Sequence, residues 1–128
     1  MLRAIGIISI ATVLISGCSL LDDEEYACGQ WASVELVEVG PVTAGKVDFT
    51  CHATVGDPCH DFERADIEKT ITDIHIRLYS MSRGGQACPQ ILDTLVVPIS
   101  VSVEGGASYT FRFWRIGRAS LDTTVYVP

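Results

Sequence analysis

The chain has 128 residues with nine basic and sixteen acidic side chains, so its formal charge at neutral pH is −7. This acidic balance argues against nucleic acid as a partner, because nucleic-acid-binding domains carry a basic patch or stripe. Beyond its first 30 positions the chain keeps about 100 residues, which is enough for one hydrophobic core and too few for two domains.

Residues 1–17 have the layout of a secretory signal. Arg3 supplies one positive charge, an uncharged apolar run extends from Ala4 to Ile15, and two small residues follow. The apolar run is shorter than the ~20 residues that a transmembrane helix needs. We therefore interpret the segment as a processing signal rather than a membrane span.

The signal ends in Ile15-Ser16-Gly17-Cys18. This tetrapeptide resembles the bacterial lipobox, in which small residues admit a peptidase next to a cysteine whose sulfur is acylated. The resemblance covers only the leader, and it implies a mature chain that begins at lipidated Cys18 and is anchored to a membrane. The alternative is an ordinary signal peptide that happens to precede a cysteine.

Residues 18–30 are predicted to form a tether, because Asp22-Asp23-Glu24-Glu25 cannot pack together and stays solvated. Ser19 directly after the cysteine resembles the outer-membrane sorting pattern. The acidic run is also similar to the surface-export signal of some Bacteroidota lipoproteins, although two apolar residues separate it from Cys18. These resemblances imply a location in the bacterial cell envelope, at the outer membrane or its surface, and a solvated spacer without a receptor is the alternative.

Setting Cys18 aside for lipid leaves Cys28, Cys51, Cys59 and Cys88, an even number in an exported chain. This count predicts two disulfides. Of the three pairings we favour Cys28 with Cys51 and Cys59 with Cys88, because residues 58–60 and 88–90 read as loops that one end of the domain can bring together. A zinc site at Cys51-His52 and Cys59-His60 is the competing interpretation, but it lacks paired C-x2-C knuckles. We expect no metal and no cofactor.

Strands dominate the pattern of residues 31–128. A weak alternation over 33–39 predicts an edge strand that Gly40-Pro41 stops, and residues 47–55 alternate strictly, with Val47, Phe49 and Cys51 on the apolar face. Residues 60–67 are polar and give a weak strand signal, and a short helical turn over 62–69 is the alternative there. The apolar residues Ile74, Ile76 and Leu78 alternate with charged ones and predict a further strand.

The second half of the domain also shows alternating strand patterns separated by loops. Glycines at 84 and 85 mark a loop, and residues 91–103 predict one strand that bends at Pro98 or two short strands that meet there. Tyr109, Phe111 and Phe113 alternate with polar residues. A last strand is predicted over 121–127.

About seven short strands in a domain of roughly 100 residues predict an all-β fold, a single antiparallel sandwich of immunoglobulin type over residues 31–128. Gly106-Ala107-Ser108-Tyr109 resembles the approach to the penultimate strand of such domains, and the resemblance implies a corner tied by the tyrosine hydroxyl. No cysteine follows Tyr109, so the antibody-type bridge between sheets is not expected. A small closed barrel is the structural alternative.

A further resemblance is to uncharacterised bacterial secreted proteins with a Pro-Cys-His turn and a later Cys-x-Gln, matched here by residues 58–60 and 88–90. It implies no activity.

Four side chains near the C-terminus make the strongest candidate binding surface, namely Arg112, Trp114, Arg115 and Arg118. For Trp114 we favour a position in the core, because strands near the middle of a sandwich often carry an inward tryptophan. The alternative is an exposed Trp114 between arginines, a composition enriched at binding hot spots. The histidines at 52, 60 and 75 have no serine in a nucleophile context nearby, and no catalytic residue is predicted.

These features predict a lipid-anchored binding or structural module without catalytic activity, with an envelope protein or a glycan as its partner. One alternative is a protease inhibitor that presents a rigid loop over Ser82–Gln90. The other is a small metal-dependent hydrolase that uses the region of His52 and His60.

Overall fold

The computed structural model of the chain describes residues 26–83 and 87–128. The predicted signal peptide and the lipidation site at Cys18 lie outside these residues. The described residues form seven strands, which are β1 (Tyr26–Thr43), β2 (Lys46–Val55), β3 (His60–Lys69), β4 (Asp73–Arg83), β5 (Asp93–Ser102), β6 (Ala107–Arg115) and β7 (Arg118–Val127). Within the described ranges, no helix is long and apolar enough to cross a membrane.

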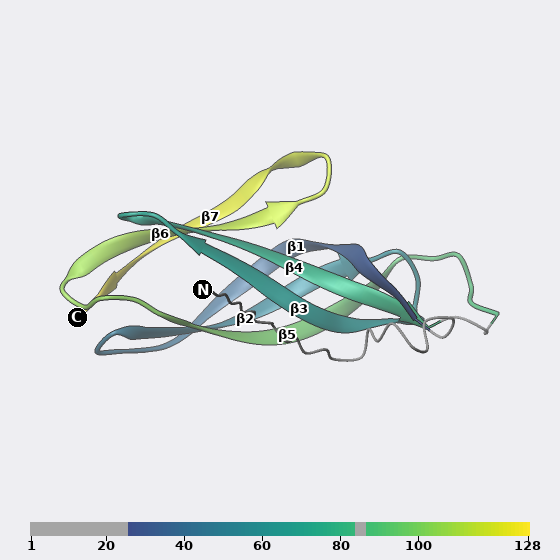
Figure 1. The fold of residues 1–128 in the computed structure, drawn as a ribbon, viewed down its shortest axis with the longest axis horizontal. Helices are drawn as coiled ribbons and strands as arrows, with labels where there is room; N and C mark the ends of the chain where they lie inside the picture. Colours follow the sequence, from purple (N-terminus) through teal and green to yellow (C-terminus); the bar gives the residue numbers. More distant parts are fainter. Residues whose placement is uncertain (1–25, 84–86) are drawn as a thin grey trace, which may run out of the picture.

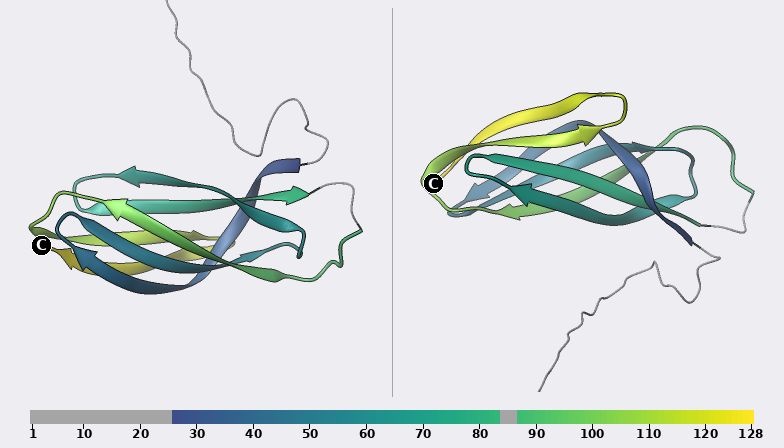
Figure 2. Two further views of the ribbon diagram at one scale, coloured as in Figure 1. Left: turned by 90° about the horizontal axis from the view of Figure 1, so that it is seen from below. Right: turned by 45° about the horizontal axis from the view of Figure 1, so that its top comes forward.

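The strands form two layers that share β1. The first part of β1 pairs with β4, and from Ser33 onward β1 pairs with β2, whose other side pairs with β5. The second layer contains β3, β4, β6 and β7 in that order. Both layers run along the long axis of the domain, as the further views show (Figure 2). The structure is thus a β-sandwich in which one long strand crosses between the sheets.

The domain has two distinct ends. β1 begins where β4 finishes, with Tyr26 opposite Arg83, and the C-terminus lies at the other end (Figure 1). The segment that precedes Tyr26 therefore joins the domain at the end that also holds the β2–β3 and β4–β5 connections.

Alternating apolar side chains fill the space between the layers. Phe49 of β2 packs edge-to-face against Phe111 and Phe113 of β6, with ring centroids 4.8 and 5.3 Å apart. All three rings are at most 1% exposed. Such contacts add about 0.5–1.5 kcal/mol per pair to the apolar burial. They connect the two sheets at the centre of the core.

The predicted all-β sandwich is confirmed, whereas the predicted strand arrangement is only partly observed. The described strand pairs are antiparallel apart from β4 and β6, which run parallel over Asp73–Ile76 and Thr110–Phe113. In the immunoglobulin arrangement the third strand pairs with the sixth. Here β4 occupies that place and β3 lies outside it.

Three local expectations differ from the structure. The predicted edge strand over 33–39 is part of β1, which continues through Gly40-Pro41 to Thr43 and pairs with both β2 and β4. Residues 60–69 form the strand β3, which agrees with the weak strand signal and not with the alternative of a helical turn, because the ladder with β4 supplies the backbone hydrogen bonds that a turn would have to find locally. The first strand starts at Tyr26, inside the segment assigned to the tether.

Pro98 does not divide its strand. β5 runs unbroken from Asp93 to Ser102 and pairs with β2 along its whole length. Proline has no N–H group to donate, and a strand with one ladder partner has donors on its other side that need no partner in the sheet.

The predicted tyrosine corner is present. The hydroxyl of Tyr109 donates a hydrogen bond to the backbone oxygen of Glu104 over 2.7 Å, and the ring is 7% exposed. Gly106 adopts a positive φ of 92° in the turn between them. At Gly105 a Cβ atom would lie 2.3 Å from the backbone oxygen of Pro128, so only glycine fits there without displacing the C-terminus.

We expect Y109F to lower the free energy of unfolding by about 1 kcal/mol, because it removes one buried hydrogen bond and leaves the packing of the ring intact. Urea unfolding followed by tryptophan fluorescence measures this loss. Y126F is the matched control, because Tyr126 is 60% exposed, and its effect should stay within about 0.5 kcal/mol. Equal losses in the two variants would contradict the stabilising role of the corner.

Candidate functional site

The outer face of the sheet formed by β3, β4, β6 and β7 carries charged and aromatic side chains that contact one another. Along β4 the residues alternate between buried Ile74, Ile76 and Leu78 and the outward-facing positions between them. The strand register then aligns side chains across the sheet. Asp66 of β3 lies opposite Arg77, and His75 lies between Glu68 and Arg112.

Cations and rings are stacked on this face. The guanidinium carbon of Arg64 lies 4.1 Å from the ring centroid of Tyr79, and that of Arg77 lies 5.0 Å from the same ring. Arg77 also lies 4.1 Å from the ring centroid of Trp114. Each such contact contributes about 0.5–1 kcal/mol where it is exposed and more where it is desolvated. The stack holds Arg77 between two rings.

The neighbouring arginines are neutralised by carboxylates. Arg112 donates to Asp122 over 2.7 Å and to Asp73 over 3.4 Å. Arg64 is paired with Glu63 at 2.6 Å and with Asp66 at 3.2 Å. These pairs are partly exposed and therefore add little stability, but they hold both guanidinium groups in place.

A groove of about 310 Å3 lies between these side chains. We name it the arginine–aromatic groove, and it is lined by Asp66, Glu68, His75, Ile76, Arg77, Tyr79, Arg112, Trp114 and Ser120. Its volume is at the lower end of the range for small-ligand sites. It combines aromatic surface with both signs of charge.

The four residues predicted as a binding surface fall into two groups. Arg112 and Trp114 line the arginine–aromatic groove. Trp114 is half-buried on the outer face under Arg77, so its assignment to the core is wrong. Arg115 and Arg118 lie at the β6–β7 turn, where both pair with Glu35 of β1.

Glu35 is the centre of that second group. Burial on its own raises the pKa of Glu35, but hydrogen bonds from Ser33 and Arg118 and the charges of Arg118 and Arg115 outweigh it, so the pKa lies below its ordinary value of 4.5. The hydroxyl of Ser33 donates to Glu35 and also accepts a hydrogen bond from the backbone N–H of Ile116 over 3.0 Å. This network fastens the hairpin to β1 and has a structural role.

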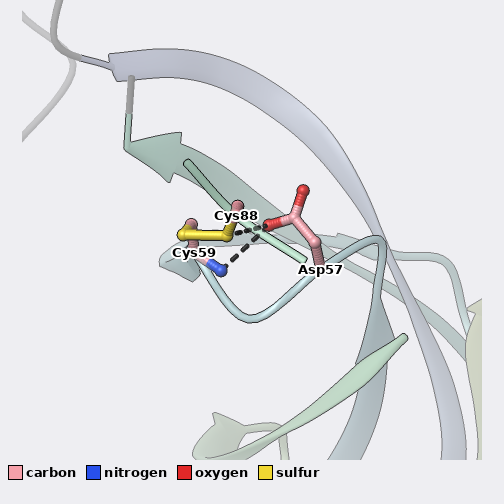
Figure 3. Close-up of side chains that lie close together, drawn as sticks. All are labelled: Asp57, Cys59 and Cys88. Atoms are coloured by element: carbon pink, nitrogen blue, oxygen red, sulfur yellow. Dashed lines mark hydrogen bonds between the residues drawn. A yellow bond between two sulfur atoms is a disulfide. The ribbon is translucent and has the colours of Figure 1, made fainter. Parts of the chain in front are cut away.

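At the end where β1 begins, the disulfide between Cys59 and Cys88 links the β2–β3 turn to the β4–β5 connection, as predicted (Figure 3). A carboxylate oxygen of Asp57 accepts hydrogen bonds from the backbone N–H of Cys59 and from the ring of His60, both over 2.9 Å. The same oxygen lies 3.4 Å from the Cys88 sulfur. We name Asp57, Cys59, His60 and Cys88 the disulfide corner.

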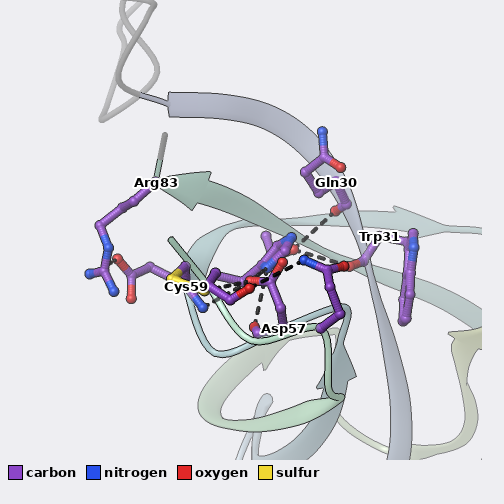
Figure 4. A network of polar contacts seen from close by, with 10 residues as sticks. Gln30, Trp31, Asp57, Cys59 and Arg83 are labelled. Atoms are coloured by element: carbon purple, nitrogen blue, oxygen red, sulfur yellow. Dashed lines mark hydrogen bonds and ion pairs between the residues drawn. A yellow bond between two sulfur atoms is a disulfide. The ribbon is translucent and has the colours of Figure 1, made fainter. Parts of the chain in front are cut away.

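Further polar contacts surround the disulfide corner (Figure 4). The backbone N–H of Arg83 donates to the carbonyl of Cys59 over 2.9 Å, and its guanidinium pairs with Asp61 at 3.1 Å. The buried hydroxyl of Ser80 donates to the backbone oxygen of Trp31 over 3.0 Å. The bridge closes a loop of about 30 residues, which stabilises the fold by about 3–4 kcal/mol in the chain-entropy model. The disulfide corner is therefore a structural anchor.

The residues suggested for a metal centre are not brought together. His52 lies on the outer face of the other sheet, between Leu36 and Val96 in register, and its nearest acidic neighbour is Glu38 at 3.7 Å. His60 belongs to the disulfide corner. Among the described residues, one group has three candidate ligand atoms close together, and it consists of Asp57 and the two bridged cysteines. Bridged sulfur atoms are not thiolates and do not bind a metal as thiolates do.

The predicted pairing of Cys28 with Cys51 is wrong. Cys51 is a free thiol, is completely buried and points into the core beside Phe49 and Ala53. Its inward position follows from the strict alternation of β2. Burial raises the pKa of Cys51 to about 12, so the thiol stays neutral and unreactive.

Sequence reasoning missed the residues at the centre of the arginine–aromatic groove. Arg77 and Tyr79 are outward-facing neighbours on β4, and the alternation of that strand already indicated their direction. Their proximity to Trp114 depends on the parallel pairing of β4 with β6. In the proposed inhibitory loop over Ser82–Gln90, residues 84–86 lie outside the described residues.

Comparison of the chain with protein-family models, with curated proteins and with solved structures finds no match. The functional assignment therefore depends on the geometry of the chain itself.

We expect Cys51 to be unreactive toward a thiol reagent in the native protein without reductant and to react once guanidinium unfolds the chain, because the thiol is fully buried and its pKa is about 12. A colorimetric thiol assay before and after unfolding measures the increase. C51A should lack that increase. Rapid labelling of Cys51 in the native state, or an unchanged increase in C51A, would contradict the assignment.

Proposed function

We propose that the chain is a non-catalytic binding module of the bacterial cell envelope, anchored by lipid on Cys18, which recognises its partner through the arginine–aromatic groove. The observation that carries this proposal is the stack of Arg77 between Tyr79 and Trp114 on a solvent-facing sheet. Tyrosine, tryptophan and arginine dominate the energetic centres of binding surfaces. A polar outer face has no packing reason to hold two rings and three arginines together.

The lipobox-like sequence supports the anchor. Seven residues lie between Cys18 and Tyr26, and the eight extended steps that join these two residues span at most about 29 Å. An anchor at Cys18 would therefore keep the start of β1 and the disulfide corner close to the bilayer. The outer face of the sheet would then rise along the side of the domain, accessible to partners in the envelope.

The acidic character of the chain supports a partner other than the membrane surface. Removal of residues 1–17 leaves eight basic side chains against sixteen acidic ones, and a charge of about −8 is repelled by anionic headgroups. The lipid would provide attachment, and the folded domain would provide recognition.

We expect C18A to move the protein from the membrane fraction to the soluble fraction of the cell, since no acyl chain can then be attached. Fractionation with immunoblotting measures the shift, and C51A is the matched control that should stay with the membrane. Membrane retention of C18A would contradict the anchor. So would a mature protein whose Cys18 sulfur is found in a disulfide, because a thioether-linked sulfur cannot form one.

The recognition surface is tested by photo-crosslinking in intact envelopes. We expect a benzophenone amino acid at position 75, in the groove, to form discrete adducts, and the same group at position 96, on the outer face of the other sheet, to form none. His75 and Val96 are both exposed, which makes the two positions comparable. In the position-75 protein, W114A should reduce adduct formation severalfold. Equal adducts from both positions, or none from either, would contradict the proposed surface.

A further inference from the structure

The charges of the arginine–aromatic groove are unevenly compensated. Among the described residues, Arg64, Arg83, Arg112, Arg115 and Arg118 each lie within 4.0 Å of at least one carboxylate. Arg77 has no carboxylate partner in the described part of the chain, although Asp66 is its cross-strand neighbour. Asp66 pairs with Arg64 instead.

The side chain of Arg77 is also poor in hydrogen bonds. Its Nε is buried without an acceptor, and the guanidinium makes no hydrogen bond with a described residue. Its contacts are the two rings, at 4.1 and 5.0 Å. The guanidinium carbon lies over both rings and Arg77 lines the groove. The planar guanidinium carries its N–H donors in a fork that matches the two oxygens of a carboxylate.

The other wall of the groove limits the charge of a ligand. Glu68 lines the groove and has no ion pair with a described residue, whereas Arg112 is already held by Asp73 and Asp122. The unpaired charges of the groove are thus one guanidinium and one carboxylate. A phosphate dianion or a run of acidic peptide side chains would be repelled by Glu68. A ligand with a single carboxylate and several hydroxyl groups can pair with both residues. Its carboxylate accepts hydrogen bonds from Arg77, and its hydroxyls donate to Glu68.

Resting on the binding function proposed above, we propose that the arginine–aromatic groove binds an acidic sugar unit of an envelope glycan, with its carboxylate on Arg77 and its hydroxyls on Glu68 and Ser120. The aromatic surfaces of Tyr79 and Trp114 fix the orientation of Arg77 and shape the groove. The lining supplies several further polar partners, as a polyhydroxylated ligand requires.

The test is a titration of the detergent-solubilised full-length protein, followed by NMR of the Trp114 indole N–H, which W114F identifies. Glucuronate is the probe. Glucose, inorganic phosphate and N-acetyl-aspartate amide are the comparison ligands. We expect glucuronate to shift the indole resonance with saturation in the millimolar range, and glucose to produce no saturable shift. R77Q should weaken glucuronate binding at least tenfold, in line with the loss of a charge-assisted hydrogen-bonded pair.

R118Q is the matched control, since Arg118 pairs with Glu35 outside the groove, and it should bind glucuronate as the wild type does.

Equal responses to glucose and glucuronate would overturn the role of the carboxylate, and stronger binding of phosphate would overturn the limit set by Glu68. Binding of N-acetyl-aspartate amide as tight as that of glucuronate would assign the groove to peptide carboxylates and overturn the glycan. An unchanged R77Q, or no response to any probe, would overturn the proposal. Crosslinking from position 75 without glucuronate binding would leave the recognition surface standing and remove only its ligand.

Discussion

The packing of Phe49 against Phe111 and Phe113 is the contact on which the rest of the structure depends. It joins the two sheets, and it fixes which face of β6 is buried. Because side chains alternate along a strand, burying Phe111 and Phe113 directs Arg112 and Trp114 outward. The same constraint on β4 directs Arg77 and Tyr79 outward opposite Ile76 and Leu78. The candidate site therefore lies on the outer face of the same strands whose inner face forms the core.

This constraint also explains what the sequence could predict. The strands over 47–55 and 109–113 follow from local alternation, and both are present. The tyrosine corner, which a resemblance implied, and the Cys59–Cys88 bridge, which was the favoured pairing, are present as well. The order of strands does not follow from local patterns. Arg77 and Trp114 meet because β4 and β6 run side by side in parallel, although dozens of residues and the strand β5 separate them along the chain. Of the residues that line the groove, Arg112 and Trp114 were therefore predicted as a binding surface, whereas Arg77 and Tyr79 were not.

Cys51 shows how two sequence signals can conflict. An even number of cysteines after the lipobox-like sequence favoured a second bridge, while the alternation of β2 placed Cys51 on the apolar face with Phe49. A disulfide requires Cα atoms about 4.4–6.8 Å apart and suitably directed side chains, and an inward residue meets that condition only if a cysteine faces it across the core. Cys51 packs in the core as a free thiol and behaves there as a small apolar side chain. The alternation of β2 was therefore a more specific signal for Cys51 than the even number of cysteines.

Unlike the neighbouring arginines, Arg77 has no carboxylate partner among the described residues, and stability alone does not explain this difference. A carboxylate partner would be easy to supply from β3, since Asp66 faces it in register, yet Asp66 is engaged by Arg64. Leaving the Nε buried without an acceptor costs free energy, and the two ring contacts offset part of that cost. A guanidinium that is held in place, partly desolvated and without a counter-ion among the described residues loses little conformational entropy when an anion binds. The two ring contacts thus hold Arg77 in place, while its charge and its Nε stay unpaired among the described residues.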